Sequence, residues 1–245
     1  MHRFKITELG REAFWLRGEE RNHLVKVLRL SVGDEIVGFD NTGTQYLAVI
    51  SKIEDKSVTC SILNAETPDV EANTPVYLVC GLSKGEKFEW VIQKGTELGM
   101  RGFVPLRARR SVVRIEKDKA QERVSRWQKI AAEAAKQCHR VVEPEVTEVC
   151  DWDNLIRILP ESTQWLIPYE AEKGNRLSEV LRELNPKEPV ALLIGPEGGF
   201  EESEVALAKD KLNARSITLG PRILRAETAA LASLTMVLAY WGDLG

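Results

Sequence analysis

The chain has 245 residues, of which 43% are hydrophobic and 29% charged, and its formal net charge is −3. A hydrophobic fraction of this size can form a folded core, which excludes an intrinsically disordered chain. The chain lacks the apolar run of a signal peptide and the ~20 apolar residues of a membrane helix, so we expect a cytoplasmic protein without membrane segments.

The cysteines are dispersed along the chain, at Cys60, Cys80, Cys138 and Cys150. Without a C-x-x-C pair, this spacing argues against a disulfide framework and against a zinc site. We therefore expect structural thiols and no bound metal.

The charges are unevenly distributed. Residues 84–140 contain 15 Lys or Arg against 7 Asp or Glu, whereas residues 141–245 contain 10 against 18. A basic segment in an acidic protein suggests a surface that faces a polyanion. A solvated helix face would have the same composition, so the charge pattern alone leaves both interpretations open.

Residues 1–70 have the pattern of a β-rich domain. The expected elements are a helix at 19–28, a turn and strand at 32–40, a hairpin turn at 41–43, and strands at 46–53 and 57–63. The polar segment 65–75 contains two prolines and little to bury, which is typical of a domain boundary. We therefore expect one domain at 1–70 and a second at 74–245.

In the second domain, short apolar strands alternate with helices. The expected strands are 76–82, 103–106, 146–149, 164–168, 190–194 and 216–219, and the expected helices are 88–98, 120–138, 153–159, 177–184, 201–212 and 227–241. This alternation predicts a parallel sheet that is covered by helices on both faces.

Two turns that connect a strand to a helix near the C-terminal end indicate a ligand pocket. Gly195–Phe200 follows one apolar strand, and Leu219–Ala230 repeats the Gly-Pro design after the next. Open α/β sheets bind ligands where their strands end, and glycine lets a ligand approach bare backbone. Each turn alone could be a tight turn and nothing more, but two adjacent ones favour a pocket.

The first of these turns is rich in carboxylates, which would repel a phosphate: Glu197, Glu201, Glu202 and Glu204. The chain also contains neither a Walker loop nor G-x-G-x-x-G. The pocket therefore suits a cofactor that is neutral or positive overall, such as S-adenosylmethionine with its sulfonium group.

Both turns resemble the paired signatures of the ribosomal RNA small subunit methyltransferase E family, which belongs to the SPOUT class of knotted methyltransferases. The resemblance continues in Asn22–Leu30, Lys94–Gly99, Arg126–Trp127, Glu133–Arg140 and Pro144–Val146, and so spans nearly the whole chain in order. Two positions depart from the family pattern. Gly95 stands where alanine is usual, and Lys136 replaces a glutamate often found there.

The resemblance implies an α/β fold with a C-terminal SPOUT-type parallel-sheet domain that contains a trefoil knot, preceded by a small PUA-like β-barrel that holds RNA. It also implies a homodimer. The helix at 227–241 is apolar nearly all round, so it is expected to be buried on several sides, within one subunit or between two.

The implied activity is methylation of N3 of a specific uridine in small-subunit (16S) ribosomal RNA. S-adenosylmethionine would be the cofactor, and the RNA partner would be bound within the small ribosomal subunit. The implied cofactor-binding residues are Leu166, Pro168, Ile194, Gly195, Pro196, Glu197, Gly198, Gly199, Leu219, Gly220, Ile223, Leu224, Arg225, Thr228 and Ala229.

Three residues are candidates for catalysis. Arg225 could stabilise a uridine anion, because it lies on the cofactor turn and keeps its charge at any relevant pH. Its alternative role is a salt bridge to Glu227 or Glu197. Asn22 and His23 match the family's Asn-His pair, which implies RNA contact or help with the proton, whereas a lone histidine is often structural.

The expected RNA contacts are mostly basic side chains. Arg107, Arg109, Arg110 and Arg114 follow the strand at 103–106, and the further candidates are Arg3, Asn22, His23, Arg29, Lys84 and Lys87. Contacts of arginine and lysine with phosphate provide affinity that falls with salt.

Two rival functions remain to be weighed. A non-catalytic RNA-binding or ribosome-assembly factor could retain the fold, but it need not keep Glu197–Gly199 and Arg225–Thr228 intact. A nicotinamide-dependent enzyme would need a dinucleotide fingerprint and an acidic residue ~20 positions further on, and the chain has neither.

Overall fold

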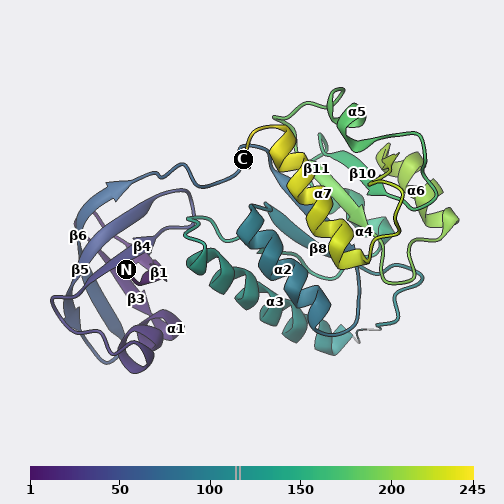
Figure 1. The fold of residues 1–245 in the computed structure, drawn as a ribbon. Coiled ribbons are helices and arrows are strands. Elements are labelled where there is room, and N and C mark those ends of the chain that lie inside the picture. Colours follow the sequence, from purple (N-terminus) through teal and green to yellow (C-terminus); the bar gives the residue numbers. More distant parts are fainter. Residues whose placement is uncertain (114, 116) are drawn as a thin grey trace. The chain divides into compact units, whose positions relative to one another are not determined.

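The computed structural model describes residues 1–113, 115 and 117–245, which form two compact units (Figure 1). The first unit contains Met1–Glu71 and Ala135–Glu143, and the second contains Ala72–Ala134 and Pro144–Gly245. The junction after Glu71 falls in the polar segment 65–75. The sequence pattern did not indicate that residues 135–143 return to the first unit.

The PUA-like part is a half-barrel, built from a six-stranded mixed sheet in the order β1-β4-β5-β6-β3-β2. Strands β1 and β4 pair in parallel, and the other neighbours pair antiparallel. The strands are β1 (Arg3–Lys5), β2 (Glu8–Leu9), β3 (Ala13–Arg17), β4 (Glu35–Phe39), β5 (Gln45–Ile53) and β6 (Ser57–Glu66).

The first three of these strands were not predicted. They have two to five residues, which is too short for a clear alternation of apolar and polar side chains. Their inward side chains Phe4, Phe14 and Leu16 are nevertheless fully buried, and they form one core with Ile36 and Ile50. The core of the first unit therefore depends on strands that only the tertiary structure reveals.

The helix predicted at 19–28 is two elements. Helix α1 (Gly18–Asn22) continues directly into a π-helix, η1 (His23–Val27), in which the Leu28 N–H donates to the His23 carbonyl at 3.0 Å. Leu24, in η1, is fully buried, and Asn22, at the end of α1, is exposed. Single π-turns within helices are frequent at functional sites.

Ion pairs attach residues 135–143 to the rest of the first unit. Arg140, which is buried, donates to Glu71 from Nε at 3.0 Å and from Nη2 at 2.6 Å. Lys136 pairs with Glu20 at 2.5 Å. A lysine at position 136, where the family often has glutamate, thus has an acidic partner in its own unit.

The second unit contains a six-stranded sheet in the order β12-β10-β11-β7-β8-β9, in which all neighbours are parallel. This confirms the predicted parallel sheet. The strands are β7 (Val76–Gly81), β8 (Gly102–Leu106), β9 (Glu145–Val146), β10 (Gln164–Pro168), β11 (Val190–Ile194) and β12 (Arg215–Ile217).

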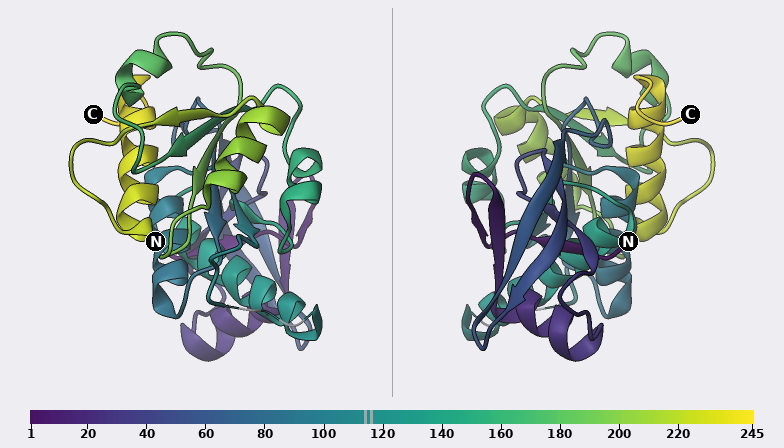
Figure 2. Two further views of the ribbon diagram at one scale, coloured as in Figure 1. Left: turned by 90° about the vertical axis from the view of Figure 1, so that its right-hand side faces the viewer. Right: turned by 90° about the vertical axis from the view of Figure 1, so that its left-hand side faces the viewer.

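Helices cover both faces of this sheet, as the sequence predicted. One face packs against α2, α3, α5 and α7, and the other packs against α4 and α6. Figure 2 shows α7 and α6 on opposite sides of the strands. The helices are α2 (Glu86–Leu98), α3 (Lys117–Gln137), α4 (Trp152–Ile158), α5 (Leu177–Leu181), α6 (Glu202–Leu212) and α7 (Ala226–Tyr240).

Close packing accounts for the glycine at position 95, where the family usually has alanine. A Cβ atom at Gly95 would lie 2.7 Å from Met100 Sδ and 3.1 Å from Leu78 Cδ1. Glycine in a helix costs about 1 kcal/mol relative to alanine. Here it allows α2 to approach β7 without displacing either neighbour.

Burial raises the pKa of the Cys60 and Cys150 thiols to about 12, so they act as apolar packing groups.

No helix in the described part of the chain is long and apolar enough to cross a membrane. Among the same residues, no cluster of His, Cys, Asp and Glu could hold a metal ion. The trefoil knot stays a prediction.

We predict that Glu71→Ala lowers the free energy of unfolding by about 3 kcal/mol, because it removes the carboxylate that accepts two N–H groups of a buried arginine. It also removes the acceptor of the Val141 and Val142 N–H groups. Urea unfolding monitored by circular dichroism measures the loss.

The matched control is Glu8→Ala, because the Arg17–Glu8 pair has both side chains more than half exposed. Exposed pairs contribute about 0–1 kcal/mol. A loss in Glu71→Ala no larger than in Glu8→Ala would contradict the anchoring role of Glu71.

Candidate active site

The site lies where three neighbouring parallel strands of the second unit end. Tyr169–Asn175 follows β10, Gly195–Phe200 follows β11, and Thr218–Arg225 connects β12 to α7. These segments enclose a cavity of about 560 Å³, with an adjoining recess of about 120 Å³. This size is within the usual range for small-molecule and cofactor sites.

Most of the predicted cofactor-binding residues line this cavity or its recess. The cavity is lined by Pro168, Ile194, Gly195, Pro196, Glu197, Gly198, Gly199, Ile223, Leu224, Arg225 and Ala229. The recess adds Leu219 and Gly220. Leu166 is instead fully buried in the core of the sheet, and Thr228 is exposed on the first turn of α7. These two do not line the cavity that the described residues form.

The turn after β11 closes on itself so tightly that it needs glycine. The Gly199 N–H donates to the Pro196 carbonyl at 2.8 Å, and Gly199 has a φ of +68°, which favours glycine. A Cβ atom at Gly195 would lie 3.0 Å from both Gly199 C and Phe200 N. Because those neighbours are backbone atoms, a side chain at Gly195 would require the turn itself to change. The turn therefore lines the cavity with backbone that no side chain covers.

The loop after β10 is held by one carboxylate. Glu172 accepts hydrogen bonds from Ser216 Oγ at 2.6 Å and from the Gly174 and Asn175 N–H groups at 2.9 and 3.2 Å. The bond from Ser216, followed by the backbone donors, lowers the pKa of Glu172 from 4.5 to about 2. These hydrogen bonds fix the conformation of the loop, which places Tyr169 and Glu170 in the cavity wall.

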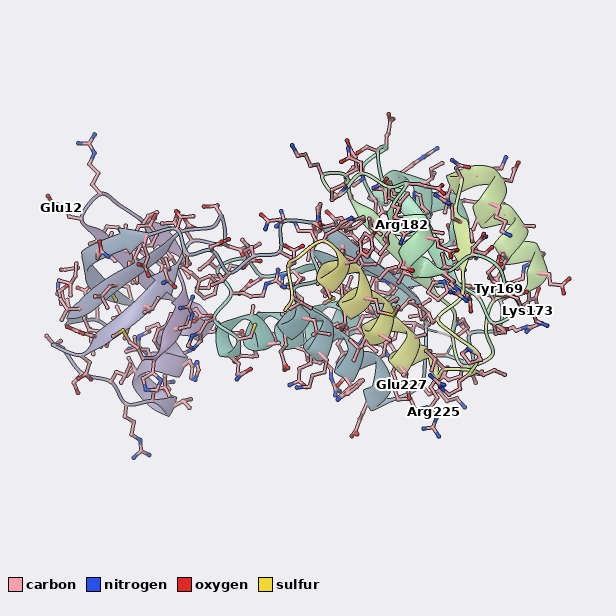
Figure 3. All side chains as sticks on the ribbon, turned by 45° about the horizontal axis from the view of Figure 1, so that its top comes forward. Glu12, Tyr169, Lys173, Arg182, Arg225 and Glu227 are labelled. Carbon is pink, nitrogen blue, oxygen red and sulfur yellow. The ribbon has the colours of Figure 1, made fainter. Side chains whose placement is uncertain are left out.

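Tyr169 and Glu170 were missed in the sequence. Both line the cavity, and Glu170 approaches the glycine turn, since a Cβ atom at Gly199 would lie 3.1 Å from its Oε1. Figure 3 shows Tyr169 on the loop after β10, with Arg225 and Glu227 at the N-terminal end of α7. The segment Tyr-Glu has no glycine signature, and only its place after a buried strand could have drawn attention to it.

Carboxylates outnumber cations in the cavity wall. The charged residues that line it are Lys87, Glu170, Glu197, Arg225 and Glu227. The Glu227 carboxylate lies 3.8 Å from Lys87 Nζ, and Glu197 Oε1 accepts a hydrogen bond from the Lys84 N–H at 3.1 Å. An excess of negative charge favours a ligand with a positive group.

Arg225 is exposed at the edge of the cavity. Within residues 1–113, 115 and 117–245, its guanidinium has no hydrogen-bond or ion-pair partner. The alternative role as a salt bridge to Glu227 or Glu197 is therefore not observed, because Lys87 and the Lys84 N–H contact those carboxylates.

The predicted RNA contacts of the second unit lie in two groups. Lys87 is exposed in the cavity wall and Lys84 is exposed next to Glu197, whereas Arg109 and Arg110 are exposed on the loop after β8. Arg107, on the same loop, is half-buried. Arg114 lies outside the described residues.

The predicted RNA contacts of the first unit differ in exposure. Arg3 is half-buried, donates to Gln45 Oε1 at 2.8 Å and lies over the Phe39 ring, and burial lowers the pKa of this arginine. The His23 ring packs edge-on against Phe4 with 6.0 Å between ring centroids, which is the structural role considered for it. Asn22 and Arg29 are exposed.

Comparison with known families agrees with this geometry. The family described as RNA methyltransferase domain matches residues 70–238, and the family described as RNA methyltransferase PUA domain matches residues 16–63. The ribosomal RNA small subunit methyltransferase E of Bacillus subtilis (strain 168) is 35% identical over 228 residues, which cover 91% of this chain and 89% of that protein. The chain belongs to the ribosomal RNA small subunit methyltransferase E family.

Two solved structures of similar proteins contain the methyl donor. A ribosomal RNA small subunit methyltransferase E from Neisseria gonorrhoeae, bound to S-adenosyl methionine, has a TM-score of 0.88 and 29% identity, and 100% of each chain is covered. A methyltransferase from Legionella pneumophila in complex with the same cofactor has a TM-score of 0.81 and 30% identity over 98% of each chain.

We predict that Glu172 makes stability depend on pH at the acidic end. Its pKa is about 2 when folded, against an ordinary 4.5, so the unfolded chain binds the proton more readily and the stabilisation is lost as pH falls from about 5 to about 2. Removing the carboxyl group in Glu172→Gln should abolish this part of the pH dependence.

Unfolding free energies of the natural protein and of Glu172→Gln, measured from pH 8 to pH 2, provide the comparison. The difference between the two proteins should be constant at pH 6–8 and shrink below about pH 5. A difference that stays constant down to pH 2 would show that Glu172 does not hold the loop as a carboxylate.

Proposed function

We propose that this protein transfers a methyl group from S-adenosylmethionine to N3 of a specific uridine in small-subunit (16S) ribosomal RNA. The observation that carries the proposal is the cavity of about 560 Å³ between the glycine turn after β11 and the start of α7, in a chain of the ribosomal RNA small subunit methyltransferase E family. The similar proteins from N. gonorrhoeae and L. pneumophila bind S-adenosylmethionine.

The donor set of the cavity fits this cofactor. Bare backbone at Gly195–Gly199 and Ile223–Leu224 offers N–H and carbonyl groups for hydrogen bonds. Glu170, Glu197 and Glu227 favour a ligand with a cationic group and disfavour a polyphosphate. When bound, S-adenosylmethionine supplies a methyl group on a sulfonium, from which the neutral thioether S-adenosylhomocysteine is a good leaving group.

The harder part of the reaction concerns the acceptor. Uridine N3 must lose a proton before it can form a bond to carbon, so the enzyme has to stabilise a uridine anion and hold it in line with the donor. Arg225 suits this task because it lies at the edge of the cavity, keeps its charge, and has no ion-pair partner among the described residues. Asn22 and His23 are proposed as RNA contacts that assist catalysis.

We predict that Arg225→Ala keeps the affinity for S-adenosylhomocysteine within about threefold but lowers kcat about 100-fold, which is the usual effect of removing one group that stabilises a developing anion. Calorimetry and a methyl-transfer assay on the same protein separate the two effects. The control is Arg222→Ala, an exposed arginine of the same segment that lines only the recess. Retained turnover in Arg225→Ala would contradict the assignment.

The exposed arginines after β8 are the proposed phosphate contacts. We predict that Arg109→Ala with Arg110→Ala reduces the slope of log affinity against log salt by about 1.4 for single-stranded RNA, because each phosphate contact contributes about 0.7. Filter binding at several salt concentrations measures the slope. Lys209→Ala with Lys211→Ala removes the same charge at the exposed end of α6 and should leave the slope unchanged. An equal slope in both double variants would contradict the proposal.

A homodimer is also proposed. Helix α7 is apolar nearly all round, yet Met236 is 44% exposed and Tyr240 is 42% exposed in the single chain. Exposed apolar side chains on a helix that also packs against the sheet are typical of a surface that a second subunit covers.

A non-catalytic RNA-binding factor is the alternative, and the complete cavity argues against it, because such a factor needs no cofactor site. Mass spectrometry of 16S ribosomal RNA from a strain that lacks this protein distinguishes the two functions. We expect one N3-methyluridine to disappear and to return when the gene is restored. Unchanged methylation would reject the proposed activity.

A further inference from the structure

Glu204 is a buried carboxylate to which the proposed reaction assigns no role. It lies in the first turn of α6, is 2% exposed, and accepts three hydrogen bonds. Its Oε1 accepts from the Arg109 N–H and from Trp152 Nε1, both at 2.9 Å, and its Oε2 accepts from the Glu201 N–H at 2.9 Å. A carboxylate with this number of donors is held in one orientation.

Helix capping explains only one of these bonds. Glu201 and Glu204 form a capping box, in which the third residue of the helix accepts from the backbone of the N-cap residue. The other two donors come from distant parts of the sequence, since Arg109 is on the loop after β8 and Trp152 begins α4. Glu204 therefore joins three segments that no local interaction would bring together.

The loop that Glu204 holds lies directly against the cavity turn. Arg110 Nη1 donates to the Gly198 carbonyl at 3.1 Å, and a Cβ atom at Gly198 would lie 3.1 Å from Arg110 Cβ. Arg109 Nη1 lies 3.3 Å from Glu201 Oε2. The Arg110 side chain of the loop with the proposed phosphate contacts thus touches the Gly198 backbone of the turn that lines the cofactor cavity.

We propose that Glu204 is a positioning residue that fixes the Arg109–Arg110 loop against the Gly195–Phe200 turn, so that binding in the cavity and RNA binding at the loop strengthen each other. The inference rests on the proposed function. A ligand bound at the turn would restrain the Gly198 carbonyl, which accepts from Arg110. It would also restrain Glu201, whose N–H donates to the same Glu204 carboxylate that accepts from the Arg109 N–H. Coupling of this kind is reciprocal, because each ligand changes the affinity of the other by the same factor.

The test compares the affinity for 16S ribosomal RNA with and without saturating S-adenosylhomocysteine. We expect at least fivefold tighter RNA binding in its presence for the natural protein. In Glu204→Gln the amide can accept on one atom only, so either Arg109 and Trp152 or Glu201 loses its acceptor. The gain in RNA affinity caused by S-adenosylhomocysteine should then fall below about twofold, although the variant still binds each ligand alone.

Glu202→Ala is the matched control, because Glu202 is exposed in the same turn of α6 and carries the same charge. It should keep the full gain. If Glu204→Gln keeps a gain as large as that of Glu202→Ala, then the positioning role is wrong. A merely structural role would lower the melting temperature of Glu204→Gln without changing the gain.

Hydrogen exchange on the natural protein tests the same inference should Glu204→Gln not fold. S-adenosylhomocysteine should slow exchange of the amides at 107–111, and unchanged exchange there would overturn the inference. Failure of the natural protein to bind S-adenosylhomocysteine at all would instead reject the proposed function. Binding of both ligands without mutual effect would overturn only the role of Glu204.

Discussion

The close approach of backbone to backbone in the turn after β11 is the constraint on which the site depends. At Gly195 a side chain would meet the backbone of Gly199 and Phe200, and at Gly81 it would lie 2.5 Å from Pro196 Cδ. The turn therefore packs against the end of β7 with nothing in between. This contact fixes the direction of the turn's backbone N–H and carbonyl groups. It thereby fixes one wall of the cavity, and the segments after β10 and β12 form the other walls.

Carboxylates around this turn serve different purposes. Glu172 and Glu204 are fully used as acceptors of hydrogen bonds and hold loops in place. Glu170 and Glu197 face the cavity and contribute negative charge to it. The acidic residues of the C-terminal segment thus have two roles. Some hold the loops of the site in place, and others favour a ligand with a positive group.

Much of this arrangement could be predicted from the sequence, because the second unit is built from local patterns. Strands β10 and β11 are apolar runs bounded by turn residues, and the two glycine turns follow β11 and β12. In the first unit, β1–β3 were missed because they are short, and because β1 and β3 pair with strands that are distant in the sequence. The return of residues 135–143 to that unit depends on Glu71 and Arg140, whose pairing has no local signal.

Contacts between segments far apart in the sequence also explain what was missed in the site. Glu170 lines the cavity on a loop that Glu172 and Ser216 hold together, and Glu204 accepts a hydrogen bond from Arg109 across 95 positions. The spacing of apolar residues along the chain does not predict such pairs. Spacing along the chain likewise does not reveal that Glu197 and Glu227 contact Lys84 and Lys87, whereas Arg225 has no ion-pair partner among the described residues.

The central claim is that the cavity binds the methyl donor and excludes a polyphosphate, and thermal unfolding tests it most directly. At about 100 times its Kd, S-adenosylhomocysteine should stabilise the protein by about 2.7 kcal/mol, a rise in melting temperature of about 5–10 °C, whereas ATP should cause no rise. No rise with S-adenosylhomocysteine, or an equal rise with ATP, would contradict the account.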